Sequence, residues 1–339
     1  MRVYASWQDK CIDSQLLVAS IVSLFKQRQL SLDKLLTGTG IFIADIRKPS
    51  HQISPKQLSR LLDNALSLWP SGDLSFLLGQ QWLPSQSGVL ISGIFCAQNL
   101  YLLGQFWHKY HWLTQPWLQT WRWQGKEEWH YLLSLDLGMQ RHQRFFIELT
   151  LSTLTACCKQ LSGQVWQGSI SFPYRAPDNL APYYKYFGTD LSFDAPLCRV
   201  SMAKDVMQQP LLFARQSVAP NHHIANTARR LLMAQPYQLG LMAAIRRQLM
   251  YANLSLPEAA KRLGMSGATL KRRLGEMGVS YGQLVDETRL IKALYCLARP
   301  EQDANSIATM LCFSDASNFR RSFKRWTGQL PTYFRYWLA

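Results

Sequence analysis

The chain has 339 residues, of which 47% are hydrophobic, a share that is typical of globular proteins and excludes a largely disordered chain. It holds 37 Lys and Arg against 21 Asp and Glu, a net charge of +16, which favours a polyanionic partner such as nucleic acid. At roughly 150 residues per domain, the length predicts two domains. The longest apolar run, Leu16 to Phe25, is interrupted by serines and is too short to cross a bilayer.

Cysteine usage points to a reducing compartment. The seven cysteines are an odd number scattered through a long chain, and the N-terminus lacks the uninterrupted apolar stretch of a signal peptide. We therefore expect a cytoplasmic protein with neither a disulfide scaffold nor a membrane association.

Residues 1–218 predict an α+β domain. Apolar residues at helical spacing predict helices over residues 16–29, 55–69, 74–82, 89–97, 100–111 and 144–161. Alternating aromatic and polar residues from Trp117 to Leu135 predict a β-hairpin that turns at Gly125-Lys126. Residues 165–172 predict a further strand, and residues 193–196 a loop.

Six of the twelve tryptophans fall between Trp107 and Trp129. They could line a ligand pocket, because such pockets are mostly apolar and aromatic, but aromatic side chains also dominate ordinary cores, and the sequence leaves both interpretations open. His108 and His111 lack a third ligand at a telling spacing, so we expect no metal site. The adjacent Cys157 and Cys158 fall on an apolar helix and are expected to be buried, inert thiols.

Two prolines predict a linker over residues 219–236. Proline disfavours helix in the residue before it, so Pro220 and Pro236 bracket a segment in which Ile224 to Met233 predicts a short amphipathic helix. Residues 237–339 hold 15 basic and 7 acidic side chains, against 22 and 14 in residues 1–236. Positive charge is therefore concentrated in the C-terminal third.

That third begins with short helices that have clear ends. A stripe of Leu241, Ile245 and Leu249 predicts one helix. Ser255, with Glu258 three residues later, predicts the start of the next, and Gly264 its end. Ser266 caps a further helix, which ends at Gly278; its apolar side carries Leu270 and Leu274, and its opposite side carries Ala268, Lys271 and Arg272. Two helices joined by a glycine turn are typical of a helix-turn-helix, whose second helix enters the DNA major groove.

The pattern occurs a second time. Ile307-Ala308 repeats Ala259-Ala260 at an offset of 48 residues. A helix that starts at Ser314 or Asp315 buries Phe319, Phe323 and Trp326 and exposes Ser317, Arg320, Arg321 and Lys324 before Gly328 ends it. Between the two units, Tyr281 to Leu297 predicts a linker helix of roughly 25 Å. With the widths of the units added, this helix could separate two recognition helices by about 34 Å, one turn of DNA.

These residues resemble the AraC/XylS family of transcription regulators. The resemblance covers residues 237–339 and is carried by Ser255 to Ser266 in the first unit, and by Phe313 to Gly328 with Pro331 and Tyr333 in the second. Two positions depart from the family pattern: Cys312 stands where glycine is usual, and Leu330 where serine is common. The layout of residues 1–218 resembles the arabinose-binding-like domain of one AraC subgroup, through Phe172-Pro173-Tyr174, Pro177, Ala181-Pro182-Tyr183, Tyr186-Phe187-Gly188, Phe193 and Ala195-Pro196.

The resemblance implies a function and a set of DNA contacts. It implies an N-terminal domain for effector sensing and dimerisation, followed by an all-α DNA-binding domain with two helix-turn-helix units. Carried over by position, the base-facing residues are Ala268, Lys271, Arg272, Ala316, Ser317, Arg320 and Arg321. Arg273, Lys324 and Arg325 are expected to contact phosphates, which set register without reading sequence.

We therefore expect a DNA-binding transcription regulator, with activation as the commoner family behaviour. The expected partners are operator DNA, RNA polymerase, an unknown small-molecule effector and a second copy of the chain; no cofactor and no enzymatic activity are expected. The alternative is a DNA-repair alkyltransferase fused to an AraC-type module, with Cys198 as the acceptor. Cys198 lacks an adjacent histidine that would activate its thiol.

Overall fold

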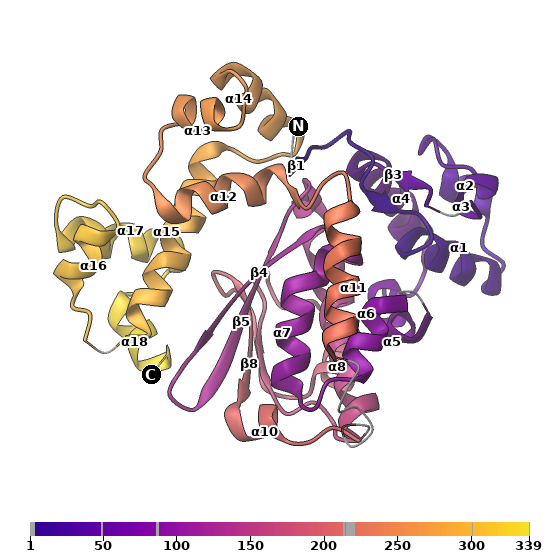
Figure 1. Ribbon diagram of the computed structural model, residues 1–339, viewed down its shortest axis with the longest axis horizontal. Coiled ribbons are helices and arrows are strands. Elements are labelled where there is room, and N and C mark those ends of the chain that lie inside the picture. Colours follow the sequence, from indigo (N-terminus) through magenta and orange to yellow (C-terminus); the bar gives the residue numbers. More distant parts are fainter. Residues whose placement is uncertain are drawn as a thin grey trace.

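The computed structural model describes residues 4–48, 50–85, 88–212, 214, 221–299 and 301–338. An α+β domain is followed by a wholly helical domain, and the helical domain lies along one side of the α+β domain (Figure 1). The predicted fold class is confirmed. The expected boundary at residues 218 and 219 lies outside the described residues.

A helical region opens the chain. A capping box starts its longest helix, α4, because the Ser54 N–H donates to the Gln57 side chain at 3.0 Å and the Gln57 N–H donates to Ser54 Oγ at 3.3 Å. Two short strands, β2 and β3, pair antiparallel beside these helices. The elements of this region are β1 (Tyr4–Ala5), β2 (Ile12–Asp13), α1 (Leu17–Gln27), α2 (Leu32–Leu36), α3 (Ile43–Ile46), β3 (Gln52–Ile53), α4 (Pro55–Leu68), α5 (Leu74–Ser85) and α6 (Gly88–Phe95).

A five-stranded sheet forms the centre of the domain, in the order β4-β5-β8-β6-β7. All neighbouring strands are antiparallel except β6 and β7. The predicted hairpin is confirmed as β4 and β5, and the predicted strand over residues 165–172 shortens to β6. The strands are β4 (Leu118–Gln124), β5 (Glu128–Leu135), β6 (Ser169–Ser171), β7 (Leu191–Ser192) and β8 (Cys198–Ala203).

Helices cover one face of the sheet. Tyr131 and Leu133 of β5 point to this face and pack with residues of α7 (Leu100–Tyr110) and α8 (Gln143–Ser162). Successive side chains of a strand alternate between faces, so Leu132 points to the other face, where it packs against the helical domain. The sheet thus separates the helical layer of the N-terminal domain from the C-terminal helical domain. The remaining elements of the domain are α9 (Ala181–Phe187), α10 (Lys204–Gln208) and the 3₁₀ turns η1 (His111–Leu113) and η2 (Met139–His142).

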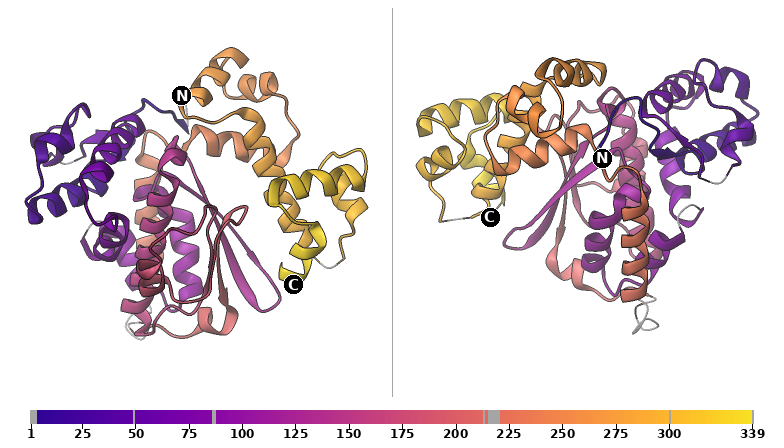
Figure 2. Two further views of the ribbon diagram at one scale, coloured as in Figure 1. Left: turned by 180° about the vertical axis from the view of Figure 1, so that it is seen from behind. Right: turned by 45° about the horizontal axis from the view of Figure 1, so that its top comes forward.

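The predicted linker helix is present but packs closely. It is α11 (Asn221–Ala234), which lies against α6 and α7, with Ala228 fully buried. After it, β9 (Leu239–Gly240) pairs in parallel with β1 near the N-terminus. The N-terminal end of the described chain therefore lies beside the helical domain in both views of Figure 2. The Tyr4 hydroxyl donates to the Leu263 carbonyl at 3.0 Å, which ties this end to the first helix-turn-helix.

The helical domain follows the predicted order closely, with one further helix at its end. Its elements are α12 (Leu241–Tyr251), α13 (Leu256–Arg262), α14 (Gly267–Glu276), α15 (Tyr281–Leu297), α16 (Ala304–Met310), α17 (Ala316–Thr327) and α18 (Pro331–Leu338). Within the described part of the chain, no helix is both long enough and apolar enough to cross a membrane.

Candidate nucleic-acid interface

The first helix-turn-helix is α13 and α14. The Ser255 N–H and hydroxyl both donate to the Glu258 carboxylate, at 2.7 and 2.6 Å, and these bonds lower the pKa of Glu258. Gly264 ends α13 at φ +70°, a conformation that glycine adopts at little cost. The Thr269 N–H donates to Ser266 Oγ at 3.2 Å and caps α14. Local sequence chemistry therefore fixes both ends of the turn.

The second helix-turn-helix is α16 and α17. Asp315, rather than Ser314, caps α17: its carboxylate accepts from the Asn318 N–H at 2.7 Å, and this bond lowers the pKa of Asp315. Cys312 adopts φ +59° at the turn, the equivalent of Gly264 in the first unit. The backbone therefore keeps the left-handed turn without glycine, at a conformational cost of roughly 1 kcal/mol.

One helix, α15, belongs to the cores of both units. Leu284, near its start, packs with Leu270 and Leu274 of α14. Ile291 and Leu294, nearer its end, pack with residues of the second unit, among them Phe319 and Phe323 of α17. The two units therefore lie at opposite ends of α15 (Figure 1), and this helix sets their separation.

The structure leaves most of the expected base-facing residues exposed. On α14 these are Ala268, Lys271 and Arg272, and on α17 they are Ser317, Arg320 and Arg321. Ala316 is different, because its side chain is only 9% exposed and packs in the core of the second unit. Ala316 therefore exposes little of its side chain for contact with a base, and its expected base contact stays a prediction.

Several of these cations have partners within the domain. Arg272 pairs with Glu276 one turn along α14, and the Arg321 guanidinium donates to the Asn318 side chain. Arg325 pairs with Asp286 of α15 at 3.1 Å. Exposed pairs of this kind contribute roughly 0.2–1 kcal/mol, so phosphate or base contacts can replace them. Lys324 is exposed, and Arg273 is half-buried beside an open cleft that Arg247 and Arg262 also line.

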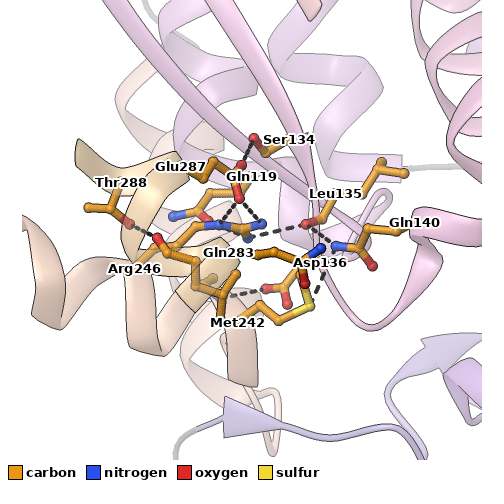
Figure 3. Close-up of polar contacts among 12 residues, drawn as sticks. Gln119, Ser134, Leu135, Asp136, Gln140, Met242, Arg246, Gln283, Glu287 and Thr288 are labelled. Atoms are coloured by element: carbon orange, nitrogen blue, oxygen red, sulfur yellow. Dashed lines mark hydrogen bonds and ion pairs between the residues drawn. The ribbon is translucent and has the colours of Figure 1, made fainter. Parts of the chain in front are cut away.

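A polar junction joins the two domains beneath the first unit (Figure 3). The carboxylate of Asp136, which follows β5, accepts from the Gly240 and Ala243 N–H groups at 3.1 and 3.2 Å, at the start of α12. A Cβ on Gly240 would lie 2.5 Å from this carboxylate, so the approach requires glycine. Asp136 is fully buried, and burial raises its pKa while Arg246 and the N–H donors oppose the rise.

The centre of the junction is Arg246 of α12, which is only 2% exposed. Its guanidinium donates to Glu287 of α15 at 2.8 and 3.1 Å, and to Gln119 Oε1 and the Leu135 carbonyl of the sheet, both at 3.1 Å. Glu287 also accepts from Ser134 of β5. A single guanidinium therefore connects two helices of the C-terminal helical domain with two strands of the N-terminal domain.

Sequence reasoning did not find this junction. The one local signal is Arg246, a charged residue beside the apolar stripe of α12. An arginine buried at this position needs several hydrogen-bond acceptors, which hints at a polar contact. Nothing in the sequence pairs Arg246 with Gln119 or Leu135, which are more than 100 residues away.

His108, His111 and the adjacent cysteines make contacts within the fold. His111 places its ring nitrogens 2.9 and 3.0 Å from the His108 and Leu118 carbonyls, and His108 bonds Thr120, so both rings serve the fold. No group of three or more potential metal ligands occurs in the part of the chain that the structure describes. Cys157 and Cys158 are buried as predicted, and burial raises the pKa of each thiol.

The tryptophan cluster divides between the two interpretations. Trp117 lies in the main core of the N-terminal domain, and Trp121 and Trp123 pack toward the DNA-binding domain. Trp107 lines an internal cavity.

Comparison with known proteins places both parts of the chain. The family model described as the arabinose-binding domain of AraC transcription regulators, N-terminal part, matches residues 30–211, and a helix-turn-helix domain model matches residues 259–336. The chain belongs to the AraC family of transcription regulators. It is thus a DNA-binding regulator with an arabinose-binding-like N-terminal domain.

This AraC-family regulator is similar to several named regulators. The chain is 29% identical to the ornithine utilization regulator of Pseudomonas aeruginosa over 93% of its own length and 94% of that protein. It is 40% identical to the transcriptional regulator VqsM of the same species over 24% of its length and 25% of that protein. Among solved structures, the regulator CdpR of P. aeruginosa is 18% identical with a TM-score of 0.46, over 94% of this chain and 97% of that one.

Proposed function

We propose that this regulator reads its operator with the exposed faces of α14 and α17, placed in two adjacent major grooves. The observation that supports this most directly is the pair of cationic faces at opposite ends of α15, which has 17 residues and is roughly 25 Å long. Together with the widths of the two units, this length suits grooves about 34 Å apart.

The cations divide by the contacts that they can make. Arg272 and Arg321 can each donate two hydrogen bonds to a guanine, worth roughly 1–3 kcal/mol of discrimination. Lys271, Ser317 and Arg320 lie on the same two faces, and Ala268 offers apolar contact to a thymine methyl. Phosphate contacts suit the remaining cations better than base contacts do; these are Arg273, Lys324 and Arg325.

We further propose that a small-molecule effector bound in the N-terminal domain controls DNA binding. In this proposal the regulator is a cytoplasmic homodimer that activates transcription together with RNA polymerase. The central sheet supports this proposal, because alternate side chains of β5 point to opposite faces of the sheet. Tyr131 and Leu133 line an internal cavity, whereas Leu132 packs with α15 and Ser134 donates to Glu287. An effector that prefers one arrangement of β5 would thereby shift the position of α15.

The same geometry disfavours an enzyme. Cys198, the acceptor in the alkyltransferase alternative, is 1% exposed, and burial raises the pKa of its thiol far above the usual range. A neutral, inaccessible thiol is a poor nucleophile. We therefore propose that the chain binds and regulates without catalysing a reaction.

The test begins with DNA selection by the full-length protein, which yields an operator with its spacing. Arg321→Ala is then expected to lose roughly 1–3 kcal/mol on the selected operator and much less on random duplex. Arg325→Ala is the matched control, expected to weaken both DNAs alike and to lower the salt dependence of binding. Equal losses on both DNAs for Arg321→Ala would refute its base contact.

A further inference from the structure

A cavity of 80 Å³ lies inside the N-terminal domain, between the sheet and helices α7 and α8. Most of its lining is hydrocarbon, from residues such as Leu100, Leu103, Leu154, Val200 and Met202. No Asp, Glu, Lys, Arg or His is among the described residues that line it. A charged ligand would lose its hydration here without a counter-ion, at a cost of several kcal/mol, so the lining selects a neutral occupant.

One polar group in this lining has no partner of its own. The Gln115 side chain is 4% exposed, and its Oε1 accepts no hydrogen bond from the described residues. A buried acceptor left in this state costs roughly 1–3 kcal/mol, which a ligand that donates to it would recover. The loop position of Gln115, directly before the sheet, holds this amide at the edge of the hydrocarbon lining.

Tyr131 supplies a second polar group to the same cavity. Its hydroxyl is buried, and burial raises its pKa although the nearby Arg122 guanidinium, which can only donate to the hydroxyl oxygen, opposes the rise. The hydroxyl proton has no acceptor among the described residues. The hydroxyl is therefore a neutral donor. Thr150 and Thr153 also line the cavity, but their hydroxyls already donate to the carbonyls of Phe146 and Leu149, each at 2.8 Å.

Size limits the occupant further. A cavity of roughly 150 Å³ holds benzene, and this one is a little over half as large. A sugar would be too large and would need a partner for every hydroxyl, whereas the described lining offers one buried acceptor, Gln115 Oε1, and one buried donor, the Tyr131 hydroxyl. The geometry points to a short hydrocarbon chain with a single polar end.

We propose that this cavity binds a small neutral molecule that has a short hydrocarbon chain and one uncharged end that both donates and accepts, such as a short-chain primary amide or alcohol. The end donates to Gln115 Oε1 and accepts from the Tyr131 hydroxyl, and the chain lies against the leucine and methionine side chains. This inference rests on the proposed effector control and specifies the effector's chemistry. It also means that the amino acid in the name of the ornithine utilization regulator does not carry over to this cavity.

The test measures ligand binding to the full-length protein without DNA. Acetamide and ethanol, which have four and three heavy atoms, are titrated against acetate and ethylammonium, which are of similar size but carry charge. Tryptophan fluorescence and calorimetry are the readouts. Trp107 and Trp166 line the cavity, so its occupation should change their emission. Molecules this small bury little surface and bind weakly, so the titration extends to roughly 10 mM.

The expected result is saturable binding of the two neutral molecules and none of the charged ones. Gln115→Leu keeps a similar volume and should weaken acetamide roughly tenfold, the loss of one hydrogen bond. Gln124→Leu, at the exposed end of β4, is the matched control and should bind as the parent does. Thr153→Leu fills the cavity and should abolish binding while thermal unfolding remains cooperative.

Two results would overturn the inference: binding of the charged molecules as strong as that of the neutral ones, or no binding of either neutral molecule in that range. Both are independent of DNA binding, so they leave the operator experiment untouched. If acetamide binds through Gln115 but the affinity for the selected operator does not change, the ligand chemistry stands and the proposed effector control fails.

Discussion

Replacing Arg246 by alanine is the sharpest test of the junction between the two domains. Its guanidinium is 2% exposed and makes four hydrogen bonds, two to Glu287 and one each to Gln119 and the Leu135 carbonyl. The substitution leaves the Glu287 carboxylate without its cation and the carbonyl without this donor. Both losses weaken the folded state, because none of these acceptors gains a new partner.

The magnitude follows from the burial of the pair. Removing one partner of a buried ion pair costs roughly 3–5 kcal/mol, mostly because the other charge is left uncompensated. Glu287 retains 20% side-chain exposure, which allows some rehydration, so we expect about 3 kcal/mol, at the lower end of that range. Removing Glu287 as well should recover part of the loss, since the orphaned carboxylate is then gone.

The assay is equilibrium urea unfolding of the full-length protein, followed by both far-UV circular dichroism and tryptophan fluorescence. Arg247→Ala is the matched control, because Arg247 is the exposed neighbour on the same helix and should change stability by less than about 0.5 kcal/mol. A loss below about 1 kcal/mol for Arg246→Ala would refute the view that this guanidinium holds the domains together.

Three further predictions concern the stability of the protein. Cys312→Gly should stabilise the protein by up to about 1 kcal/mol in the same assay, because it removes a side chain at φ +59°. The control Cys296→Gly, within α15, should instead destabilise the protein. A destabilising Cys312→Gly would contradict the strain argument. Gly240→Ala should cost roughly 1–3 kcal/mol, since the added methyl meets the Asp136 carboxylate at 2.5 Å, and full stability would show that the junction can relax. Burial lowers the pKa of His108 and of His130 from 6.5 to about 4. As the pH falls, these two histidines therefore bind protons in the unfolded chain before they do so in the folded protein. The free energy of unfolding should drop between pH 6.5 and 4, by up to about 3 kcal/mol for each ring. Glutamine at both positions should flatten this pH dependence, and an unchanged slope would assign it to other groups.

The DNA-binding domain could be predicted almost completely because its signals are local. Helix starts are marked by hydrogen bonds between residues three positions apart. These bonds involve Ser255 with Glu258, the N-cap Ser266 and the N-cap Asp315. Gly264 and Gly328 mark helix ends through a backbone conformation that other residues adopt at a cost. The burial of Ala316 could not be predicted in this way, since it depends on how α17 packs onto α16.

The N-terminal domain was predicted less fully because its signals are not local. Strand β8 was missed, although Cys198, Val200 and Met202 alternate with polar residues, because a run of only six residues is too short for its period to be decisive. Its position between β5 and β6 depends on pairing with residues more than 60 positions earlier in β5. Helix α9 was missed in the same way, although Tyr183 and Phe187 lie four residues apart and are both buried.

The amino-acid sequence by itself determined the two helix-turn-helix units, with their caps, their turns and the cationic faces of their second helices. Each of these features arises from residues within one or two helical turns of one another. Only the tertiary structure decided how the domains meet. It placed Arg246 against the sheet, put Gln115 and Tyr131 into one cavity, and set that cavity and α15 on opposite faces of a single strand. Contacts across more than 100 residues have no local signature, because what stabilises them is burial and pairing that exist only once the chain has folded.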